Sequence, residues 1–295
     1  MTGVDIVGAL DIGGTHVAGG RVDVLAASVE PRSRMSEPLP ARGTRAELLA
    51  VISKVARSIA VPPIARLGIA VPGPFDYGGG VSEIAHKLEG LEGVDLRAEL
   101  HAASVVPDAA AIRFLNDAEA FLVGEWWAGA ARGHARAVGV TLGTGLGSAF
   151  GEEGKIVRSG ERVPPHGELY RLDFEGRPVE RTISRAGLLD VYRGAPRDDD
   201  DVEQLASRAL EGEEAARDVF THLGTSLGRF LLPWLRSFEP SCLVVGGSIA
   251  RSWALFASSL RAELDSVPGL RAVTVADHLE DAPLLGVAYH AAGRL

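Results

Sequence analysis

The chain contains Leu10-Asp11-Ile12-Gly13-Gly14-Thr15 near its start and Thr141-Leu142-Gly143-Thr144-Gly145-Leu146-Gly147 near its middle. Each of these glycine-rich stretches follows an apolar run that is typical of a buried strand, Val4–Leu10 and Ala137–Leu142, and each precedes further β-type sequence. The repeated pattern therefore predicts two β-hairpins whose tips are rich in glycine.

These tips have the composition of loops that hold anions through backbone amides. Glycine lets amide N–H groups come close to a ligand, and neither tip contains a lysine. Neither tip fits the lysine-containing phosphate loop or the dinucleotide-binding glycine motif. A third apolar run, Cys242–Val245, leads into the pair Gly246-Gly247. One such turn is usually an ordinary tight turn, whereas three of them after β-rich runs favour phosphate binding.

The composition excludes several classes of protein. The 295 residues are 46% hydrophobic, which is enough to bury the core of one large domain or two smaller ones. The formal net charge is −9 and there is no dense block of lysine and arginine, which argues against binding nucleic acid or an anionic membrane. A small or neutral ligand is the better expectation.

Cysteine usage and the N-terminus both favour the cytoplasm. The single cysteine, Cys242, lies in an apolar run and cannot form an intrachain disulfide, so we interpret it as a small buried hydrophobic residue. No basic region followed by an apolar stretch opens the chain, and no apolar run reaches the roughly 18 residues that span a bilayer. We therefore expect a cytoplasmic protein without a signal peptide.

Strands and helices alternate along the whole chain. The first half predicts, in order, strands at Val4–Leu10, His16–Asp23 and Val24–Val29, a helix at Thr44–Ile59, strands ending at Val71 and Asp117, and a helix at Ala118–Ala130. The second half predicts a strand at Ala137–Leu142, loops at Pro164-Pro165 and at Asp198–Asp201, a helix at Gly212–Phe238, a strand at Cys242 and a C-terminal helix at Leu284–Ala292. A glycine-tipped hairpin followed by helix and strand thus occurs in each half.

Five motifs together point to a family. They are Asp11-Ile12-Gly13-Gly14-Thr15, Val71-Pro72-Gly73-Pro74, Leu115-Asn116-Asp117-Ala118, Leu142-Gly143-Thr144-Gly145-Leu146-Gly147 and Val245-Gly246-Gly247. In order and spacing they resemble the ROK family (repressors, open reading frames and kinases), which holds bacterial glucokinases, fructokinases, N-acetylhexosamine kinases and related transcription regulators. The resemblance covers nearly the whole chain.

The resemblance implies an α/β protein with the actin-like ATPase (ribonuclease H-like) fold. Two domains with mixed sheets would close on a sugar and ATP in the cleft between them. A small N-terminal domain would span residues 1–115 and be joined by the C-terminal helix at about residues 282–295, and a large domain would span residues 116–281. A homodimer is also implied.

The resemblance further implies a set of nucleotide ligands. The phosphates would be held by Gly13, Gly14, Thr15, Gly143, Thr144 and Gly145, and the adenosine would lie beside Gly246 and Gly247. Magnesium would accompany ATP, with Asp11 near the ion. These roles agree with the anion-binding character of the glycine-rich tips.

Asp117 is the expected catalytic base. Transfer of a phosphoryl group to a sugar hydroxyl needs an acceptor for the hydroxyl proton, and Asp117 follows Asn116 at a strand end, before a helix. In the family pattern Asp117 is the catalytic aspartate and Asn116 is a sugar ligand. Taken alone, Asn-Asp at a helix start would be interpreted as a helix cap; within the five motifs we favour catalysis.

The remaining sugar ligands follow from the resemblance, and here the chain departs from the family. Glu168 and Glu180 stand where the family has its two sugar-binding glutamates, and Gly73 belongs to the same expected sugar site. Tyr170 and Arg171 replace the usual glycine and histidine. Arg171 would then donate hydrogen bonds in place of the histidine and repel an ammonium group, and the two glutamates could compensate for such a cation.

Four further positions bear on the expected site. His166 is an alternative substitute for the missing histidine, although loop histidines are more often simply solvated. The short stretch Leu172–Val179 contains no cysteine where the family has a zinc-binding cluster, so we expect no zinc site. Segment Ser82–Gly93, with His86 and Lys87, stands where the family has a sugar-contacting loop, and His16 replaces a common lysine.

Three functions compete. The first is an ATP-dependent kinase that phosphorylates the 6-hydroxyl of a hexose, either glucose or an amino sugar such as glucosamine or kanosamine; the choice between ATP and polyphosphate as donor stays open. The second is a sugar-responsive DNA-binding regulator, which is disfavoured because only ten residues precede Asp11. The third is a catalytically inactive sugar-binding protein, which would be expected to lack Asp117 or the glycine loops.

Overall fold

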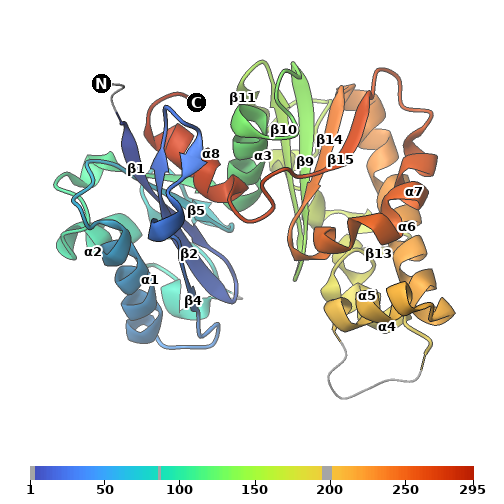
Figure 1. Ribbon diagram of the computed structural model, residues 1–295, viewed down its shortest axis with the longest axis horizontal. Helices are drawn as coiled ribbons and strands as arrows, with labels where there is room; N and C mark the ends of the chain where they lie inside the picture. Colours follow the sequence, from blue (N-terminus) through green and yellow to red (C-terminus); the bar gives the residue numbers. More distant parts are fainter. Residues whose placement is uncertain (1–3, 86–87, 195–200) are drawn as a thin grey trace. The chain divides into compact units, whose positions relative to one another are not determined.

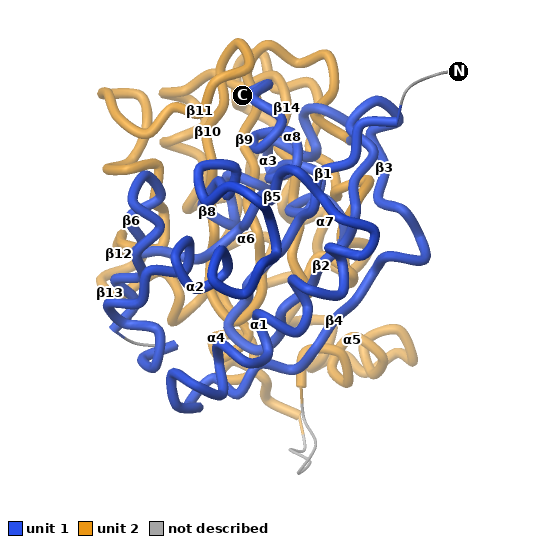
Figure 2. Tube along the Cα trace, turned by 90° about the vertical axis from the view of Figure 1, so that its left-hand side faces the viewer, with its two compact units in different colours: residues 1–129, 280–295 blue, residues 130–279 orange. Residues whose placement is uncertain are grey.

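The computed structural model describes residues 4–85, 88–194 and 201–295. They form two compact units, coloured separately in Figure 2: one runs to Gly129 and takes in Glu280–Leu295, and the other comprises Ala130–Leu279. The division falls after helix α3 (Asp117–Ala128), whereas the family resemblance implied a boundary after residue 115. Helix α3 stays with the first unit because it packs along the C-terminal helix α8 (Ala282–Ala291).

The first unit is built on a six-stranded mixed sheet (Figure 1). Its strands are β1 (Ile6–Ile12), β2 (His16–Asp23), β3 (Ser28–Val29), β4 (Met35–Pro38), β5 (Leu67–Val71) and β8 (Ile112–Asn116), in the order β3-β2-β1-β5-β8 with β4 paired to β2. Strands β1 and β2 are antiparallel, and β1, β5 and β8 run parallel. The carboxyl ends of these three parallel strands therefore meet at one edge of the sheet. A small hairpin, β6 (Phe75–Asp76) and β7 (Val81–Ser82), follows β5.

Local sequence explains where the helices of this unit begin. Helix α1 (Arg45–Ile59) starts at a capping box, in which Thr44 and Glu47 exchange side-chain and backbone hydrogen bonds. Asp95 caps the short helix α2 (Leu96–Ala102) in a similar way. The expected strand at Val24–Val29 is wrong in its first part: Asp23 accepts hydrogen bonds from the amides of Leu25 and Ala26, so the chain turns before β3.

Helices α3 and α8 approach each other through two glycines. A Cβ on Gly124 of α3 would overlap the backbone of Ala282, and a Cβ on Gly286 of α8 would overlap the backbone of Ala120. The two helices thus pack closer than larger side chains would allow, and α8 also lies against β5. This packing joins the last helix of the chain to the sheet of the first unit.

The second unit has a five-stranded sheet of the same topology. Its strands are β9 (Arg136–Leu142), β10 (Leu146–Glu152), β11 (Lys155–Ile156), β14 (Cys242–Gly246) and β15 (Ala272–Val275), in the order β11-β10-β9-β14-β15. Strands β9 and β10 are antiparallel, and β9, β14 and β15 are parallel. Each unit therefore repeats one plan, a hairpin followed by two parallel strands. The sequence pattern predicted the two hairpins and the strands β5, β8 and β14, but not β15.

The helices of the second unit are α4 (Arg185–Val191), α5 (Val202–Glu211), α6 (Glu214–Phe238) and α7 (Trp253–Leu264), and a two-stranded ladder joins β12 (Asp173–Phe174) and β13 (Arg177–Pro178). The helix expected to start at Gly212 begins at Glu214, because Gly212 adopts a left-handed conformation with φ 108° that ends α5. Asp201 caps α5 as expected, and residues 198–200 of the same expected loop lie outside the described residues. Helix α7 was not predicted.

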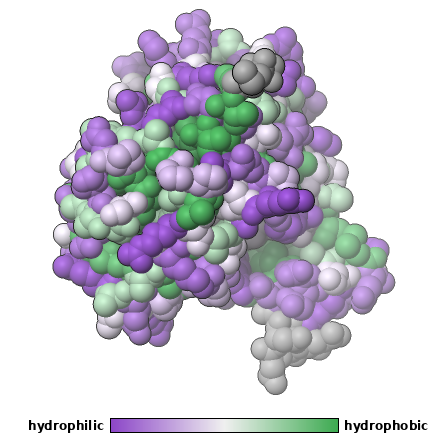
Figure 3. All heavy atoms as spheres, turned by 60° about the vertical axis from the view of Figure 1, so that its left-hand side comes forward, coloured by the Kyte–Doolittle hydropathy of each residue, from purple (hydrophilic) through white to green (hydrophobic). Residues whose placement is uncertain are grey.

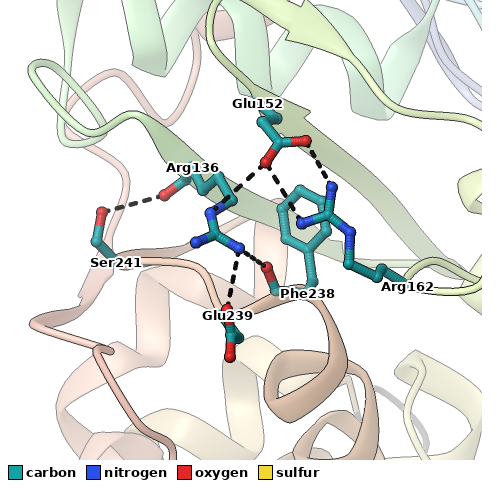
Figure 4. Close-up of polar contacts among 6 residues, drawn as sticks. All are labelled: Arg136, Glu152, Arg162, Phe238, Glu239 and Ser241. Carbon is teal, nitrogen blue, oxygen red and sulfur yellow. Dashed lines mark hydrogen bonds and ion pairs between the residues drawn. The ribbon is translucent and has the colours of Figure 1, made fainter.

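Charged side chains fix the end of the β9–β10 hairpin that lies opposite its tip (Figure 4). Arg136, the first residue of β9, donates to the carbonyl oxygen of Phe238 at 2.8 Å and to the Glu239 carboxylate at 3.3 Å. Glu152, the last residue of β10, accepts from Arg162 at 2.8 Å and lies 3.7 Å from the Arg136 guanidinium. The hairpin is thereby tied to the C-terminal end of α6 and to the segment that carries Arg162.

On the face drawn in Figure 3, hydrophilic side chains predominate and apolar ones gather in smaller areas. Among the described residues the largely exposed large apolar side chains are Val4, Leu25, Val61, Leu210 and Leu295. None of the helices in the described part of the chain has the length and apolar character needed to cross a membrane. The expected homodimer stays a prediction.

Candidate functional site

Gly13 and Gly14 form the tip of the first hairpin, and neither the backbone conformation nor the packing there requires glycine. The amide of Gly13 donates to the carbonyl oxygen of His16 at 2.9 Å, which closes the turn. Neither Gly13 nor Gly14 has a positive φ. A Cβ on Gly14 would have no neighbour within 4 Å, and one on Gly13 would meet only the His16 carbonyl oxygen, at 3.4 Å. The glycines thus leave room beside the backbone amides for a group from outside the chain.

Thr15 and His16 complete this tip. Both side chains are exposed, and the Nδ1 atom of His16 lies 3.0 Å from the Thr15 hydroxyl oxygen. His16, an exposed residue of β2, therefore contacts the loop residue that is expected to hold phosphate.

Three expected site residues converge at the carboxyl edge of the first sheet. Asp11 lies near the end of β1, Gly73 follows β5 by two residues, and Asp117 follows β8 directly. Because β1, β5 and β8 are parallel neighbours, all three lie at the edge where α/β sheets bind their ligands. The sequence predicted the residues, and the parallel pairing brings them to the same edge.

Asp11 and Asp117 influence each other electrostatically. Burial and, to a smaller extent, the negative charge of Asp117 raise the pKa of Asp11 to about 7. When two carboxylates repel each other, a cation bound between them stabilises the ionised form of both. Mg²⁺ is commonly held by one or two carboxylates together with phosphate oxygens and water, so the pair fits this ion. In the described part of the chain no group of three or more metal-binding side chains occurs.

Asn116 serves as the cap of helix α3, and Asp117 is the first residue of that helix. The Oδ1 atom of Asn116 accepts hydrogen bonds from the amides of Ala118 at 3.0 Å and Glu119 at 3.2 Å. The helix-cap interpretation is therefore correct for Asn116, while its side-chain amide group remains able to donate.

Tyr77 is a site residue that the sequence analysis missed. The Nδ2 group of Asn116 donates to the Tyr77 hydroxyl oxygen at 3.1 Å, and that hydroxyl donates to the carbonyl oxygen of Val71 at 3.3 Å. The only sequence signal is an aromatic residue directly before a run of glycines, Gly78–Gly80. Tyr77 thus connects the end of β5 to the expected sugar ligand Asn116.

The second hairpin carries the other glycine tip and is tied to the Glu180 segment. The amide of Gly143 donates to the carbonyl oxygen of Gly145 at 3.0 Å, and the carbonyl oxygen of Gly143 accepts from the amide of Arg185 at 2.9 Å. The carboxylate of Glu180 accepts from the amide of Leu146 at 2.9 Å. Thr144, at the tip, is exposed. The expected phosphate loop and an expected sugar ligand are therefore directly hydrogen-bonded.

Gly246 ends strand β14 and Gly247 follows it, and Gly247 has a structural reason to be glycine. Its φ is 82°, and a Cβ there would overlap the backbone of Leu142 at the end of β9. The close approach places Ser248 beside the second tip, because a Cβ on Gly143 would lie 3.4 Å from the Ser248 hydroxyl oxygen. Packing within the chain alone accounts for this glycine.

Glu168 lies in a small cluster with the two residues that depart from the family pattern. Its carboxylate forms an ion pair with Arg171, whose guanidinium also lies over the Tyr170 ring at 5.1 Å from the ring centre. Burial and the nearby Glu168 carboxylate, which accepts a hydrogen bond from Tyr170, raise the pKa of Tyr170. The hydrogen bond to Glu168 raises the pKa of Arg171, so the guanidinium stays charged. Arg171 thus neutralises Glu168 from within the chain.

His166 and the expected sugar-contacting loop complete the set of expected sugar-site positions. His166 is exposed and has a left-handed backbone with φ 60°. The hypothesis that it substitutes for the family histidine stays a prediction. His86 and Lys87, from the expected sugar-contacting loop, lie outside the described residues.

Comparisons with known proteins agree with these features. The glucokinase of Thermotoga maritima is 26% identical over 250 residues, which cover 75% of this chain and 77% of that protein. The N-acetylmannosamine kinase of Salmonella heidelberg is 28% identical over 309 residues, covering 97% of this chain and 98% of that protein. The crystal structure of a ROK family glucokinase from Streptomyces griseus, in complex with glucose and AMPPNP, matches with a TM-score of 0.81 at 21% identity, covering 98% of this chain and 99% of that one.

The structural match confirms the expected fold, an α/β protein with mixed sheets and the actin-like ATPase architecture. A model of the ROK family matches residues 7–294. With the family pattern present over nearly its whole length, this chain belongs to the ROK family.

Proposed function

We propose that this protein is an ATP-dependent sugar kinase that transfers a phosphoryl group to the 6-hydroxyl of a hexose. The observation that carries the proposal is the carboxylate pair Asp11 and Asp117 beside a tip whose glycines leave room for an outside group. Relatives named as glucokinase and N-acetylmannosamine kinase support the same reaction class.

The glycine tips hold the phosphate groups in this proposal. Gly13, Gly14 and Thr15 offer backbone amides and a hydroxyl, and Gly143, Thr144 and Gly145 offer the same kinds of group. Such fixed donors stabilise the charge that develops on a transferring phosphoryl group. Adenosine binds beside Gly246 and Gly247.

Asp117 accepts the proton of the attacking sugar hydroxyl. Helix α3 begins at Asp117, and the Asn116 cap fixes that beginning, so the carboxylate is held at the edge of the sheet. ATP would supply the phosphoryl group, and Mg²⁺ would neutralise part of its negative charge. Asp11, whose pKa is raised by burial and by the charge of Asp117, would hold the ion.

Asn116, Glu168 and Glu180 orient the sugar. The Asn116 amide donates, while the two carboxylates accept from sugar hydroxyls and thereby select their directions. Gly73 belongs to the same set of sugar contacts. Since Glu180 is also bound to the amide of Leu146, sugar recognition and the second phosphate loop share one scaffold.

A neutral hexose, with glucose as the first candidate, fits this site better than an amino sugar. Arg171 already forms an ion pair with Glu168, so this carboxylate offers less attraction to the ammonium group of glucosamine or kanosamine. Arg171 and the alternative His166 both remain candidates for the position of the missing family histidine. A cytoplasmic location and a homodimer complete the proposal.

The test measures phosphoryl transfer to glucose, mannose, fructose, N-acetylglucosamine, glucosamine and kanosamine, with ATP or polyphosphate as donor and Mg²⁺ present. Wild type is compared with Asp117→Asn and with Asp108→Asn, which makes the same change before β8 instead of after it. We expect Asp117→Asn to lower kcat by about 10²- to 10⁴-fold and Asp108→Asn to leave it unchanged.

If wild type transfers phosphate to no sugar from either donor, the proposed function is wrong. Calorimetric titration with the same sugars then decides whether the protein is a catalytically inactive sugar binder. Equal activity of Asp117→Asn and wild type would instead remove Asp117 as the base.

A further inference from the structure

The segment that leads to Glu168 contacts every second residue of strand β10 from Ser148 to Glu152. The amide of Val157 donates to the carbonyl oxygen of Phe150 at 2.8 Å. Arg162 pairs with Glu152 and lies over the Phe238 ring, as Figure 4 shows. The last attachment is made by Ser148, close to Glu168 itself.

Ser148 holds the chain on both sides of Glu168. Its hydroxyl donates to the carbonyl oxygen of Gly167 at 2.6 Å and accepts from the amide of Leu169 at 2.9 Å. One hydroxyl can fill both roles at once. The Ser148 residue is only 8% exposed, so water has little access to replace either bond.

The backbone just before Glu168 needs such support. His166 and Gly167 are both left-handed, with φ of 60° and 74°, and a non-glycine residue in this region is strained. The amide of Glu168 itself is bound to the carbonyl oxygen of Pro165 at 3.1 Å, within the same turn. The Ser148 hydroxyl connects this turn to the sheet.

We propose that Ser148 is a positioning residue: by holding Gly167 and Leu169 it sets the place and direction of the Glu168 carboxylate. The inference rests on the proposed function, in which Glu168 binds the sugar. Strand β10 then positions both sugar carboxylates, because the amide of Leu146 on the same strand holds Glu180. Loss of the Ser148 hydroxyl leaves two buried backbone groups without their partner and releases the turn.

A double-mutant cycle separates positioning from a merely structural role. The variants are Ser148→Ala, Glu168→Ala and the pair, and the readouts are KM for the sugar, KM for ATP and kcat. We expect Ser148→Ala to raise the sugar KM by about tenfold, with the ATP KM changed less than about twofold. In the Glu168→Ala background the same substitution should change the sugar KM by less than about twofold.

The matched control is Ser226→Ala, which removes another buried serine hydroxyl of the same unit, 5% exposed and on helix α6. We expect it to leave the sugar KM unchanged. The inference is overturned if Ser148→Ala leaves the sugar KM unchanged. It is also overturned if Ser148→Ala raises the sugar KM by the same factor in the Glu168→Ala background as in wild type.

A readout that needs no activity distinguishes failure of this inference from failure of the proposed function. Hydrogen exchange at the Leu169 amide should be at least tenfold faster in Ser148→Ala than in wild type, and unchanged in Ser226→Ala. An inactive wild type with this exchange pattern would remove the kinase proposal and keep the role of Ser148 in holding the turn. Unchanged exchange at Leu169 would remove the role of Ser148 whether or not the protein is a kinase.

Discussion

The negative charge of Asp117 at the end of β8 acts on Asp11 at the end of β1, and together with the burial of Asp11 it raises the pKa of that carboxyl to about 7. The two side chains come from strands separated by β5, and they share the carboxyl edge of one sheet. Catalytic sites often hold groups whose pKa is shifted in this way, because the arrangement that serves the ligand is unfavourable for the free protein.

This relationship predicts a pH dependence of stability. The pKa of Asp11 is about 7 in the folded chain and about 3.8 as a free side chain, so between these values the folded state binds more protons than the unfolded state. The contribution of Asp11 to the free energy of unfolding therefore falls as the pH rises from about 4 to about 7.

Asp11→Asn removes this titration. We expect the difference in free energy of unfolding between Asp11→Asn and wild type to be more favourable to the variant at pH 8 than at pH 5. At pH 8 the Tm of the variant should exceed that of wild type by a few degrees. Urea and thermal unfolding at the two pH values measure the difference. Asp108→Asn, an exposed control in the same unit, should show no such trend, and a constant difference for Asp11→Asn would contradict the prediction.

Substitution by alanine should affect nucleotide binding at Gly14 and stability at Gly247. A Cβ on Gly14 meets no neighbour in the chain, so Gly14→Ala should change the free energy of unfolding by less than about 1 kcal/mol while raising the KM for ATP by about tenfold or more. A Cβ on Gly247 overlaps the Leu142 backbone, so Gly247→Ala should destabilise the fold by about 3 kcal/mol or more.

Thermal unfolding and the ATP KM of both variants provide the measurement. An unchanged ATP KM in Gly14→Ala would show that this tip does not approach the nucleotide. Normal stability of Gly247→Ala would show that the turn after β14 can move away from Leu142.

Arg171 should set the preference between neutral and amino sugars. Arg171→Gln removes the cation that pairs with Glu168, so the carboxylate becomes a stronger partner for an ammonium group. We expect the ratio of kcat/KM for glucosamine to that for glucose to rise by about three- to tenfold, which corresponds to about 1 kcal/mol. Because the pair is partly exposed, the effect should weaken at high salt.

Arg177→Gln is the matched control, because Arg177 carries the same charge and is exposed on the neighbouring strand β13. Its sugar preference should equal that of wild type. A shift of similar size in both variants would mean that net charge, and not the ion pair with Glu168, decides the preference.

Tyr77 should contribute to sugar binding through Asn116. Tyr77→Phe removes the hydroxyl that accepts from the Asn116 amide and donates to Val71, while the ring stays packed against Phe75. We expect a stability loss of about 1 kcal/mol and a rise of a few-fold in the sugar KM, with the ATP KM unchanged. Tyr289→Phe is the control for loss of a tyrosine hydroxyl in the same unit, and an equal sugar KM in Tyr77→Phe and wild type would contradict the role.

Short-range sequence patterns were sufficient to predict most of the strands and helices and to propose candidate site residues. Local composition was sufficient for the glycine-tipped hairpins, for strand β2 at His16–Asp23 and for helix α1, whose cap Thr44 precedes it directly. The five motifs placed Asp11, Asn116 and Asp117 at strand ends. Such signals are readable because strand, cap and turn preferences act between residues that are close in sequence.

The contacts between segments that are distant in sequence are seen only in the tertiary structure. Helix α3 belongs to the first unit because the C-terminal helix packs along it, and Gly124 and Gly286 permit that contact through backbone approach. The roles of Tyr77 and Ser148 depend on hydrogen bonds to Asn116, Gly167 and Leu169. The sequence does not show which group a hydroxyl will bind, because the partners are brought together only when strands and turns pack.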